Sequence, residues 1–255
     1  MAQTRTALSI RALKFRYAAE GDAPWIVDVG ALDLAPGEQI LLTGGSGRGK
    51  STLLQLIAGL LDPTSGHIAV DGIVVHFLHG ARRDLYRGQK IGMIFQTFNL
   101  LHGFSALENV MVAMMFSKIP RHEHRLRAVK LLTRLGIERP EANPDAMSVG
   151  QQQRVAVARA MACDPVLVLA DEPTASLDPE NSVGAMDLIQ TACREKGAAL
   201  LCVSHDPAMK DRFERRASLA ELAGNGSEGN AGGAAAPENR GSASGPDIAG
   251  RIGGR

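Results

Sequence analysis

The sequence predicts an α/β fold built around a mostly parallel sheet, and two patterns support this. Apolar runs of strand length occupy residues 39–43, 166–170 and 198–203. Segments with apolar residues at helical spacing alternate with them, one beginning at Ser51 and one spanning residues 181–196. Strands that alternate with helices in this way form parallel sheets with helices on both faces.

Two further segments complete the expected organisation. Residues 7–43 hold short apolar runs separated by Gly, Pro and Asp, which predicts a small β-rich N-terminal region ending in a buried strand. A helical pattern covers residues 107–134, and a second helix begins near Ser148 after a break rich in Gly and Pro. We therefore expect a helical lobe inserted into the α/β core.

Composition restricts the kind of protein. The chain has 255 residues, 45% of them hydrophobic, which is enough for one sizeable core. Its 28 Lys and Arg against 27 Asp and Glu leave a net charge of +1, so we expect no nucleic-acid partner. Cys163, Cys193 and Cys202 lack metal-type spacing and are expected to be buried thiols of a cytoplasmic protein. We expect neither a secretory signal nor a membrane-spanning helix, which needs roughly 20 apolar residues.

The last part of the chain differs in composition. Residues 223–255 are rich in Gly, Ala and Ser and hold few large apolar side chains. Burial cannot offset the conformational entropy that such a segment would lose on ordering. We predict one folded domain over residues 7–222 and a disordered tail over residues 223–255.

A glycine-rich loop follows the first predicted parallel strand. Residues 44–51 match G-x-x-x-x-G-K-[ST] between a strand and a helix. In such loops main-chain N–H groups point at phosphate oxygens, the lysine adds positive charge and the serine hydroxyl can bind Mg²⁺. The alternative, a Gly/Ser turn with a solvated lysine, is disfavoured by the strand–loop–helix context. The predicted nucleotide-binding residues are Gly44, Gly45, Ser46, Gly47, Arg48, Gly49, Lys50, Ser51 and Thr52.

Two adjacent carboxylates end the second predicted parallel strand. Asp171 and Glu172 follow the apolar run at 166–170, which places them at the carboxyl edge of the sheet, where open α/β folds bind ligands. Asp171 is suited to hold Mg²⁺, and Glu172 to activate a water that attacks a γ-phosphate. Alternatively, one of the two caps a helix that begins with Pro173, and without the glycine-rich loop the two interpretations are even.

Several short motifs then follow in the order found in one family. Residues 147–151, Met-Ser-Val-Gly-Gln, look like the Leu-Ser-Gly-Gly-Gln signature of ABC ATPases, and residues 152–160 are very close to the family pattern. Over residues 8–219 the chain resembles the ABC ATPase family. The resemblance implies a P-loop NTPase fold with a mostly parallel sheet core, an N-terminal antiparallel β subdomain and a helical signature subdomain at about residues 97–160.

The resemblance implies a catalytic set. Gln96 looks like the glutamine that touches both Mg²⁺ and the coupling helix of a permease, and His205 looks like the histidine that senses the γ-phosphate. Together with Glu172 they are the expected catalytic residues. The expected metal ligands are Ser51, Gln96 and Asp171.

Other residues are implied in nucleotide binding. Tyr17 would stack on adenine, although Trp25 lies nearby and strand aromatics are often core residues. Asp178, in Ser-Leu-Asp at 176–178, is similar to the loop that crosses the dimer interface. The signature residues implied to contact ATP across that interface are Ser148, Gly150 and Gln151.

Members of this family work as two cassettes that close head to tail around two ATP molecules. Residues 91–101 and 170–178 look most like the lipoprotein-release and macrolide-export branch. The resemblance thus implies an ATP- and Mg²⁺-dependent ATPase that forms a homodimer and lies on the inner face of the cell membrane through a separate integral membrane permease. One alternative is a soluble ATPase of the iron–sulfur assembly type. The other is a low-turnover regulatory module, motivated by Val149 in place of the first signature glycine.

Overall fold

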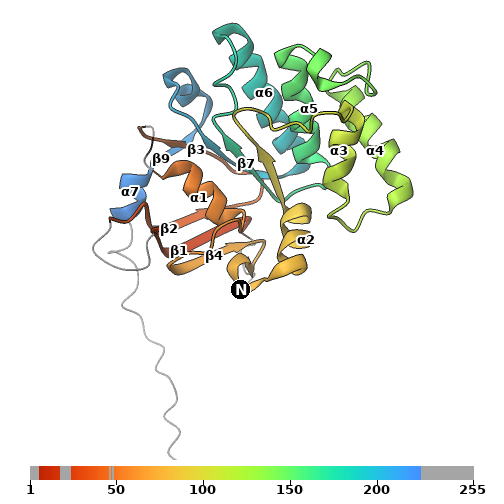
Figure 1. Cartoon of the computed structure of the whole chain (residues 1–255). Helices are drawn as coiled ribbons and strands as arrows, with labels where there is room; N and C mark the ends of the chain where they lie inside the picture. Colours follow the sequence, from red (N-terminus) through yellow and green to blue (C-terminus); the bar gives the residue numbers. More distant parts are fainter. Residues whose placement is uncertain (1–5, 18–23, 46, 48, 225–255) are drawn as a thin grey trace, which may run out of the picture.

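The computed structural model of the protein describes residues 6–17, 24–45, 47 and 49–224 (Figure 1). The predicted tail lies outside the described residues apart from its first two positions, which end helix α7 (Leu219–Gly224). The predicted α/β fold with a parallel core, an antiparallel N-terminal sheet and a helical lobe is confirmed.

The antiparallel sheet has the strand order β2-β1-β4-β5. Strand β1 contains a β-bulge that changes which of its side chains face the core. Ala12 adopts a left-handed φ of 47°, and the register with β4 shifts between Arg11 and Lys14. Leu8 and Ile10 before the bulge and Leu13 and Phe15 after it therefore all face the core. The strand bounds are Leu8–Phe15 (β1), Val27–Leu34 (β2), Ser65–Val70 (β4) and Ile73–Val74 (β5).

The parallel sheet has the strand order β6-β7-β8-β3-β9 and is buried on both faces. Leu167 and Leu169 of β7 join the core beneath α1, whereas Val168 and Ala170 join the core beneath α5 and α6. Burial of alternate residues on opposite faces explains why these strands are continuous apolar runs. The strand bounds are Gln39–Thr43 (β3), Ile91–Ile94 (β6), Leu167–Asp171 (β7), Ala199–Val203 (β8) and Arg215–Ser218 (β9).

Helices lie on both faces of the parallel sheet, and α3 and α4 form one edge of the molecule (Figure 1). The single helical pattern predicted over residues 107–134 is wrong, because α3 ends at Met114 and α4 begins only after Pro120. Helix α2 went unpredicted since it is strongly charged and buries no residue. The helix bounds are Lys50–Ile57 (α1), Gly80–Lys90 (α2), Ala106–Met114 (α3), Arg121–Arg134 (α4), Val149–Met161 (α5) and Pro179–Lys196 (α6).

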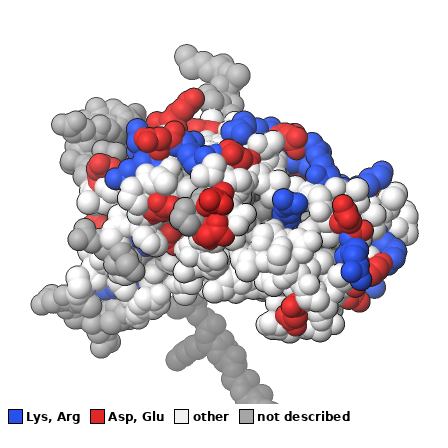
Figure 2. Space-filling model, turned by 90° about the horizontal axis from the view of Figure 1, so that it is seen from above, with Lys and Arg blue, Asp and Glu red and all other residues white. Residues whose placement is uncertain are grey.

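Charge is mixed on the surface. On the face drawn in Figure 2, lysine and arginine side chains lie among aspartate and glutamate side chains. Any partner on that face must therefore be recognised through local contacts rather than through a broad electrostatic potential of one sign. None of the helices in the described part of the chain combines the length and the apolar character that crossing a bilayer requires.

Candidate functional site

A cleft with a volume of about 450 Å³ opens where the parallel strands β3, β7 and β8 end. Residues from the glycine-rich loop, from the ends of β7 and β8 and from the N-terminal sheet meet there. The structure therefore brings together side chains that are as far apart in the chain as Tyr17 and His205. The lining residues are Tyr17, Ile26, Gly47, Gly49, Lys50, Ser51, Thr52, Gln96, Asp171, Glu172, Val203 and His205.

The glycine-rich loop has a backbone that side chains would not permit. Gly49 adopts a φ of 84°, and a Cβ there would lie 2.2 Å from the carbonyl oxygen of Ile26. Only glycine fits at such a position. Two predicted loop residues, Ser46 and Arg48, lie outside the described residues.

Lys50 is held inside this loop. Its side chain is buried, and its Nζ donates to the carbonyl oxygens of Gly44 at 2.7 Å and Gly45 at 2.8 Å. Lys50 is also the first residue of α1, so a positive charge and the N-terminus of a helix lie at the same point. Both favour an anion such as a phosphate in the cleft.

Ser51 and Asp171 face each other at one wall of the cleft. The Ser51 hydroxyl donates to the Asp171 carboxylate at 3.1 Å. Burial raises the pKa of the Asp171 carboxyl, and nearby Glu172 adds to this, whereas Ser51 and Lys50 oppose it. A hydroxyl beside a partly desolvated carboxylate is a donor set that fits Mg²⁺.

Glu172 lies on the other side of the strand end and pairs with His205. The backbone of Glu172 is left-handed, with a φ of 47°, and its side chain is only 15% exposed. Nδ1 of His205 lies 2.7 Å from the Glu172 carboxylate, and the main-chain N–H of His205 donates to the same carboxylate at 3.3 Å. The helix-capping alternative is wrong, because the next helix, α6, is capped by Asp178.

Of the two candidate aromatic residues, the structure places Tyr17 at the cleft. Its ring is 66% exposed and packs edge-on against Phe15, with 5.0 Å between ring centroids. Trp25 instead lies against the guanidinium of Arg16, 4.7 Å from the ring centroid, and the ammonium of Lys14, 5.6 Å away. An exposed ring at the edge of a phosphate-binding cleft is suited to stacking on a base.

The signature residues lie elsewhere. Ser148 caps α5 and forms a reciprocal capping box with Gln151. Val149 is the first helical residue and is absent from the described residues with positive φ, so its backbone does not need glycine. A Cβ on Gly150 would meet open space. Neither these residues nor Asp178 line the described part of the cleft.

Gln96 follows β6 and reaches the cleft from the helical lobe side. Its carbonyl oxygen accepts a hydrogen bond from the Ser176 hydroxyl at 3.1 Å. The segment after β6 is therefore hydrogen-bonded to the segment that follows β7. From the sequence, Gln96 was predicted to lie at this site because of the family resemblance. No local pattern indicated it.

Comparison with known proteins agrees with this geometry. The sequence profile described as "ABC transporter" matches residues 28–175. The chain belongs to the ABC transporter ATPase family. It shares the P-loop NTPase fold of solved ABC cassettes.

Two curated relatives are similar over most of this chain. An uncharacterized ABC transporter ATP-binding protein of Mycobacterium bovis, Mb2593, is 43% identical over 209 residues, which make up 82% of this chain but only 63% of Mb2593. The lipoprotein-releasing system ATP-binding protein LolD of Bordetella avium is 40% identical over 197 residues, which make up 76% of this chain and 85% of LolD.

Solved ABC cassettes are similar in fold. The dimeric structure of MJ0796, a bacterial ABC transporter cassette, has a TM-score of 0.73 and 33% identity, and the match covers 83% of this chain and 93% of that one. MJ0796 as a post-hydrolysis dimer bound to ADP and Pi also has a TM-score of 0.73, with 32% identity and coverage of 85% and 95%.

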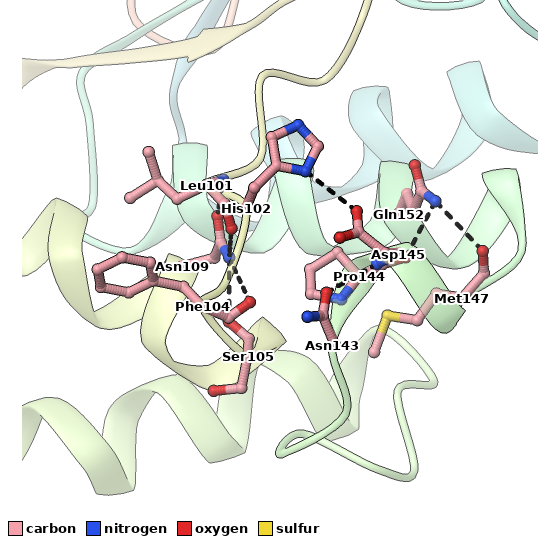
Figure 3. Close-up of polar contacts among 10 residues, drawn as sticks. All are labelled: Leu101, His102, Phe104, Ser105, Asn109, Asn143, Pro144, Asp145, Met147 and Gln152. Atoms are coloured by element: carbon pink, nitrogen blue, oxygen red, sulfur yellow. Dashed lines mark hydrogen bonds and ion pairs between the residues drawn. The ribbon is translucent and has the colours of Figure 1, made fainter.

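One polar residue of this ABC subunit was missed by sequence reasoning. Asn109 on α3 is fully buried and holds the segment that leads from Gln96 into the helical lobe (Figure 3). It accepts from the N–H of Leu101 at 2.7 Å and donates to the carbonyl oxygens of Phe104 and Ser105 at 3.3 and 3.0 Å. In the sequence, Asn109 is a polar residue among apolar ones on a helix, a pattern that solvent-exposed helix positions produce as well.

Proposed function

We propose that this chain hydrolyses ATP as one half of a head-to-tail homodimer that drives a separate membrane permease of the lipoprotein-release or export type. One observation carries the proposal. The cleft gathers the phosphate-binding, metal-binding and acid–base groups, whereas Ser148 and Gly150 of the signature present an open helix N-terminus outside it. A second copy brings its signature to this cleft and completes the site.

Within each cleft the residues divide the work. Lys50 leaves the loop carbonyls and binds the β- and γ-phosphates, while Tyr17 stacks on adenine. Glu172 orients the attacking water and accepts its proton, and His205, which now lies 2.7 Å from its carboxylate, turns toward the γ-phosphate. Helix α5 of the second copy adds N–H groups that stabilise the charge of the transferring phosphoryl group.

Ser51, Gln96 and Asp171 are the proposed ligands of Mg²⁺. A bound Mg²⁺ supplies positive charge that offsets the negative charge on the β- and γ-phosphate oxygens. The Ser51 hydroxyl and the Asp171 carboxylate, which already lie 3.1 Å apart, would hold the cation.

A second groove supports the permease part of the proposal. It has a volume of about 400 Å³ and lies between the α2–β6 segment and helices α3 and α5, with Met93, Phe95 and Phe116 among its lining residues. Phe116 is 50% exposed and its neighbour Met115 is 60% exposed. Apolar side chains exposed around a hollow are suited to receive a short helix of a partner.

The lipoprotein-release assignment rests on similarity to LolD. With it we propose that the subunit lies on the cytoplasmic side of the membrane, bound to its permease. The test uses Glu172→Gln, loaded with ATP, as bait in native membranes, with the captured proteins identified by mass spectrometry. We expect a stoichiometric integral membrane permease. Capture should be lost with Phe116→Asp and retained with Leu126→Asp, which alters a comparably exposed apolar residue on α4. No permease, or equal capture by both variants, contradicts the proposal.

A further inference from the structure

Two consecutive non-glycine residues shortly after Gln96 adopt a left-handed backbone, which is costly for Phe98 and more readily adopted by Asn99. Phe98 has a φ of 59° and Asn99 a φ of 47°. The left-handed region is sterically costly for a residue with a bulky side chain, and Phe98 is in addition buried in the protein. Such a conformation persists only where surrounding contacts impose it, so the turn at Phe98–Asn99 requires a partner that holds it.

Arg159 is that partner. It lies in the last turn of α5, about 60 residues away in the chain, and its two terminal nitrogens donate to the carbonyl oxygens of Phe98 at 2.6 Å and Asn99 at 2.5 Å. Arg159 is half-buried, and this burial lowers the pKa of its guanidinium. A guanidinium donates to the two carbonyls from two separate nitrogens held in one rigid plane, whereas a lysine ammonium offers a single nitrogen at the end of a flexible stem.

Other contacts fix the neighbouring main-chain groups. The Gln96 carbonyl accepts from Ser176 at 3.1 Å, and the Thr97 carbonyl accepts from the N–H of Asn99 at 2.7 Å. The Phe95 carbonyl accepts from the N–H of Phe98 at 3.1 Å. Every main-chain carbonyl from 95 to 99 thus has a partner, and the two farthest from Gln96 depend on Arg159.

We infer that Arg159 is a positioning residue: it holds the Phe98–Asn99 turn, and thereby sets where Gln96 enters the nucleotide cleft. The inference deepens the proposed function and rests on it. Arg159 also lines the proposed permease groove and belongs to the helix that begins with the signature. A partner that binds in this groove can therefore contact Arg159. Through this one side chain it would affect both the Gln96 segment and the signature helix.

A second contact joins the same two regions. Nδ1 of His102 lies 3.2 Å from the Asp145 carboxylate, which connects the segment after Gln96 to the residues just before the signature (Figure 3). Both side chains are largely exposed, so this ion pair contributes little. Arg159, which is partly buried and bonds twice, is the stronger link between the loop and α5.

The test replaces Arg159 with Lys, which keeps the positive charge but not the two separate nitrogens that donate to Phe98 and Asn99. Arg125→Lys is the matched control, because Arg125 forms an exposed ion pair with Glu141 on the outside of the helical lobe. We expect Arg159→Lys to lower kcat by about 10- to 100-fold through misplacement of Gln96, with the KM for ATP changed by less than about 2-fold. Hydrogen–deuterium exchange in residues 97–105 should rise while α5 stays protected, a readout that does not depend on activity.

Two further variants separate positioning from a merely structural effect. Asn99→Gly in the Arg159→Lys chain should recover most of the lost kcat, because glycine adopts a left-handed backbone without help. Asn99→Val alone should reproduce the loss without touching α5, since a β-branched residue resists that backbone. This second variant keeps the inference testable if Arg159→Lys proves unstable.

The outcomes are distinct. A fall in kcat without a change in KM, rescued by Asn99→Gly, supports the inference. An unchanged kcat, or a loss that Asn99→Gly fails to rescue, overturns it. Lys50→Ala is assayed alongside. If Lys50→Ala still hydrolyses ATP, the proposed function is wrong. If Lys50→Ala loses hydrolysis and Arg159→Lys has no effect, only the Arg159 inference is wrong.

Discussion

The cleft and the start of the signature helix of this chain differ in how far their surface residues contact the rest of the chain. In the cleft, the charged side chains have partners within the chain: Lys50 bonds loop carbonyls, Asp171 bonds Ser51, and Glu172 bonds His205. At the start of α5, space lies open above Gly150 and Val149 is 47% exposed. The comparison teaches that the side chains of the cleft are held by contacts within the chain, whereas the surface around the first residues of α5 is open, as the proposed dimer requires.

The predictions below separate these two regions. Changes in the cleft should alter ATP binding or chemistry in each chain, and changes at the signature should alter only what two chains do together. They run from the largest expected effect to the smallest.

The largest effect is expected from Glu172→Gln, which removes the proton acceptor while keeping the shape of the side chain. Because general-base catalysis contributes about 100- to 10,000-fold, kcat should fall within that range while ATP binding stays unchanged. Steady-state hydrolysis together with equilibrium binding of a fluorescent ATP analogue measures both. Loss of binding in parallel with kcat would show that Glu172 holds the nucleotide rather than the water.

Lys50→Ala should weaken ATP binding by on the order of 100-fold, since it removes charge-assisted hydrogen bonds worth about 1.5–3 kcal/mol each. Titration with the same fluorescent ATP analogue measures the change. The matched control is Lys130→Ala, which removes an exposed lysine of the helical lobe and should leave affinity unaltered. Tight ATP binding by Lys50→Ala contradicts the assignment of the cleft.

Val149→Gly tests the signature half. The backbone there does not require glycine, so any effect comes from clearing an exposed branched side chain away from the second copy. Turnover should rise by about 3-fold, which corresponds to less than ~1 kcal/mol of barrier. ATP affinity of the single chain, measured at low protein concentration, should not change. An unchanged or lower turnover would show that the valine is accommodated at the interface.

Asp171→Asn should change stability only slightly. The variant should be slightly more stable than the parent although it loses activity. Burial raises the pKa of Asp171, so the folded protein favours the protonated acid and loses stability as pH rises above the unfolded value of about 3.9. Asparagine removes this penalty. The variant should therefore melt slightly higher than the parent at pH 7, and the difference should shrink as pH falls toward about 4. A lower Tm at pH 7 contradicts the account of this carboxylate, and hydrolysis should be lost in either case.

Much of the fold followed from local patterns. The buried strands β3, β7 and β8 begin and end within one residue of the apolar runs, because both faces of the parallel sheet are covered. Helix α2 gave no such pattern, since none of its residues is fully buried. The break between α3 and α4 was hidden by the apolar residues Met115, Phe116 and Ile119 between them.

The candidate site divides in the same way. The glycine-rich loop and the acidic strand end were visible as short contiguous motifs, and the structure places both at one cleft. The Arg159 contact could not be predicted, because it joins residues about 60 positions apart through main-chain carbonyls. It also depends on a left-handed backbone at Phe98 and Asn99, and a bulky residue such as Phe98 does not indicate one.

The most direct test of the central claim, that one ATP site needs two chains, is analytical ultracentrifugation of Glu172→Gln with and without ATP. We expect a dimer with ATP and a monomer without it. Adding Ser148→Glu, which places a negative charge at the start of α5, should abolish the dimer while leaving ATP binding by the monomer intact, and Thr133→Glu on the exposed face of α4 should do neither. A dimer that survives Ser148→Glu, or a monomer that no longer binds ATP, contradicts the account.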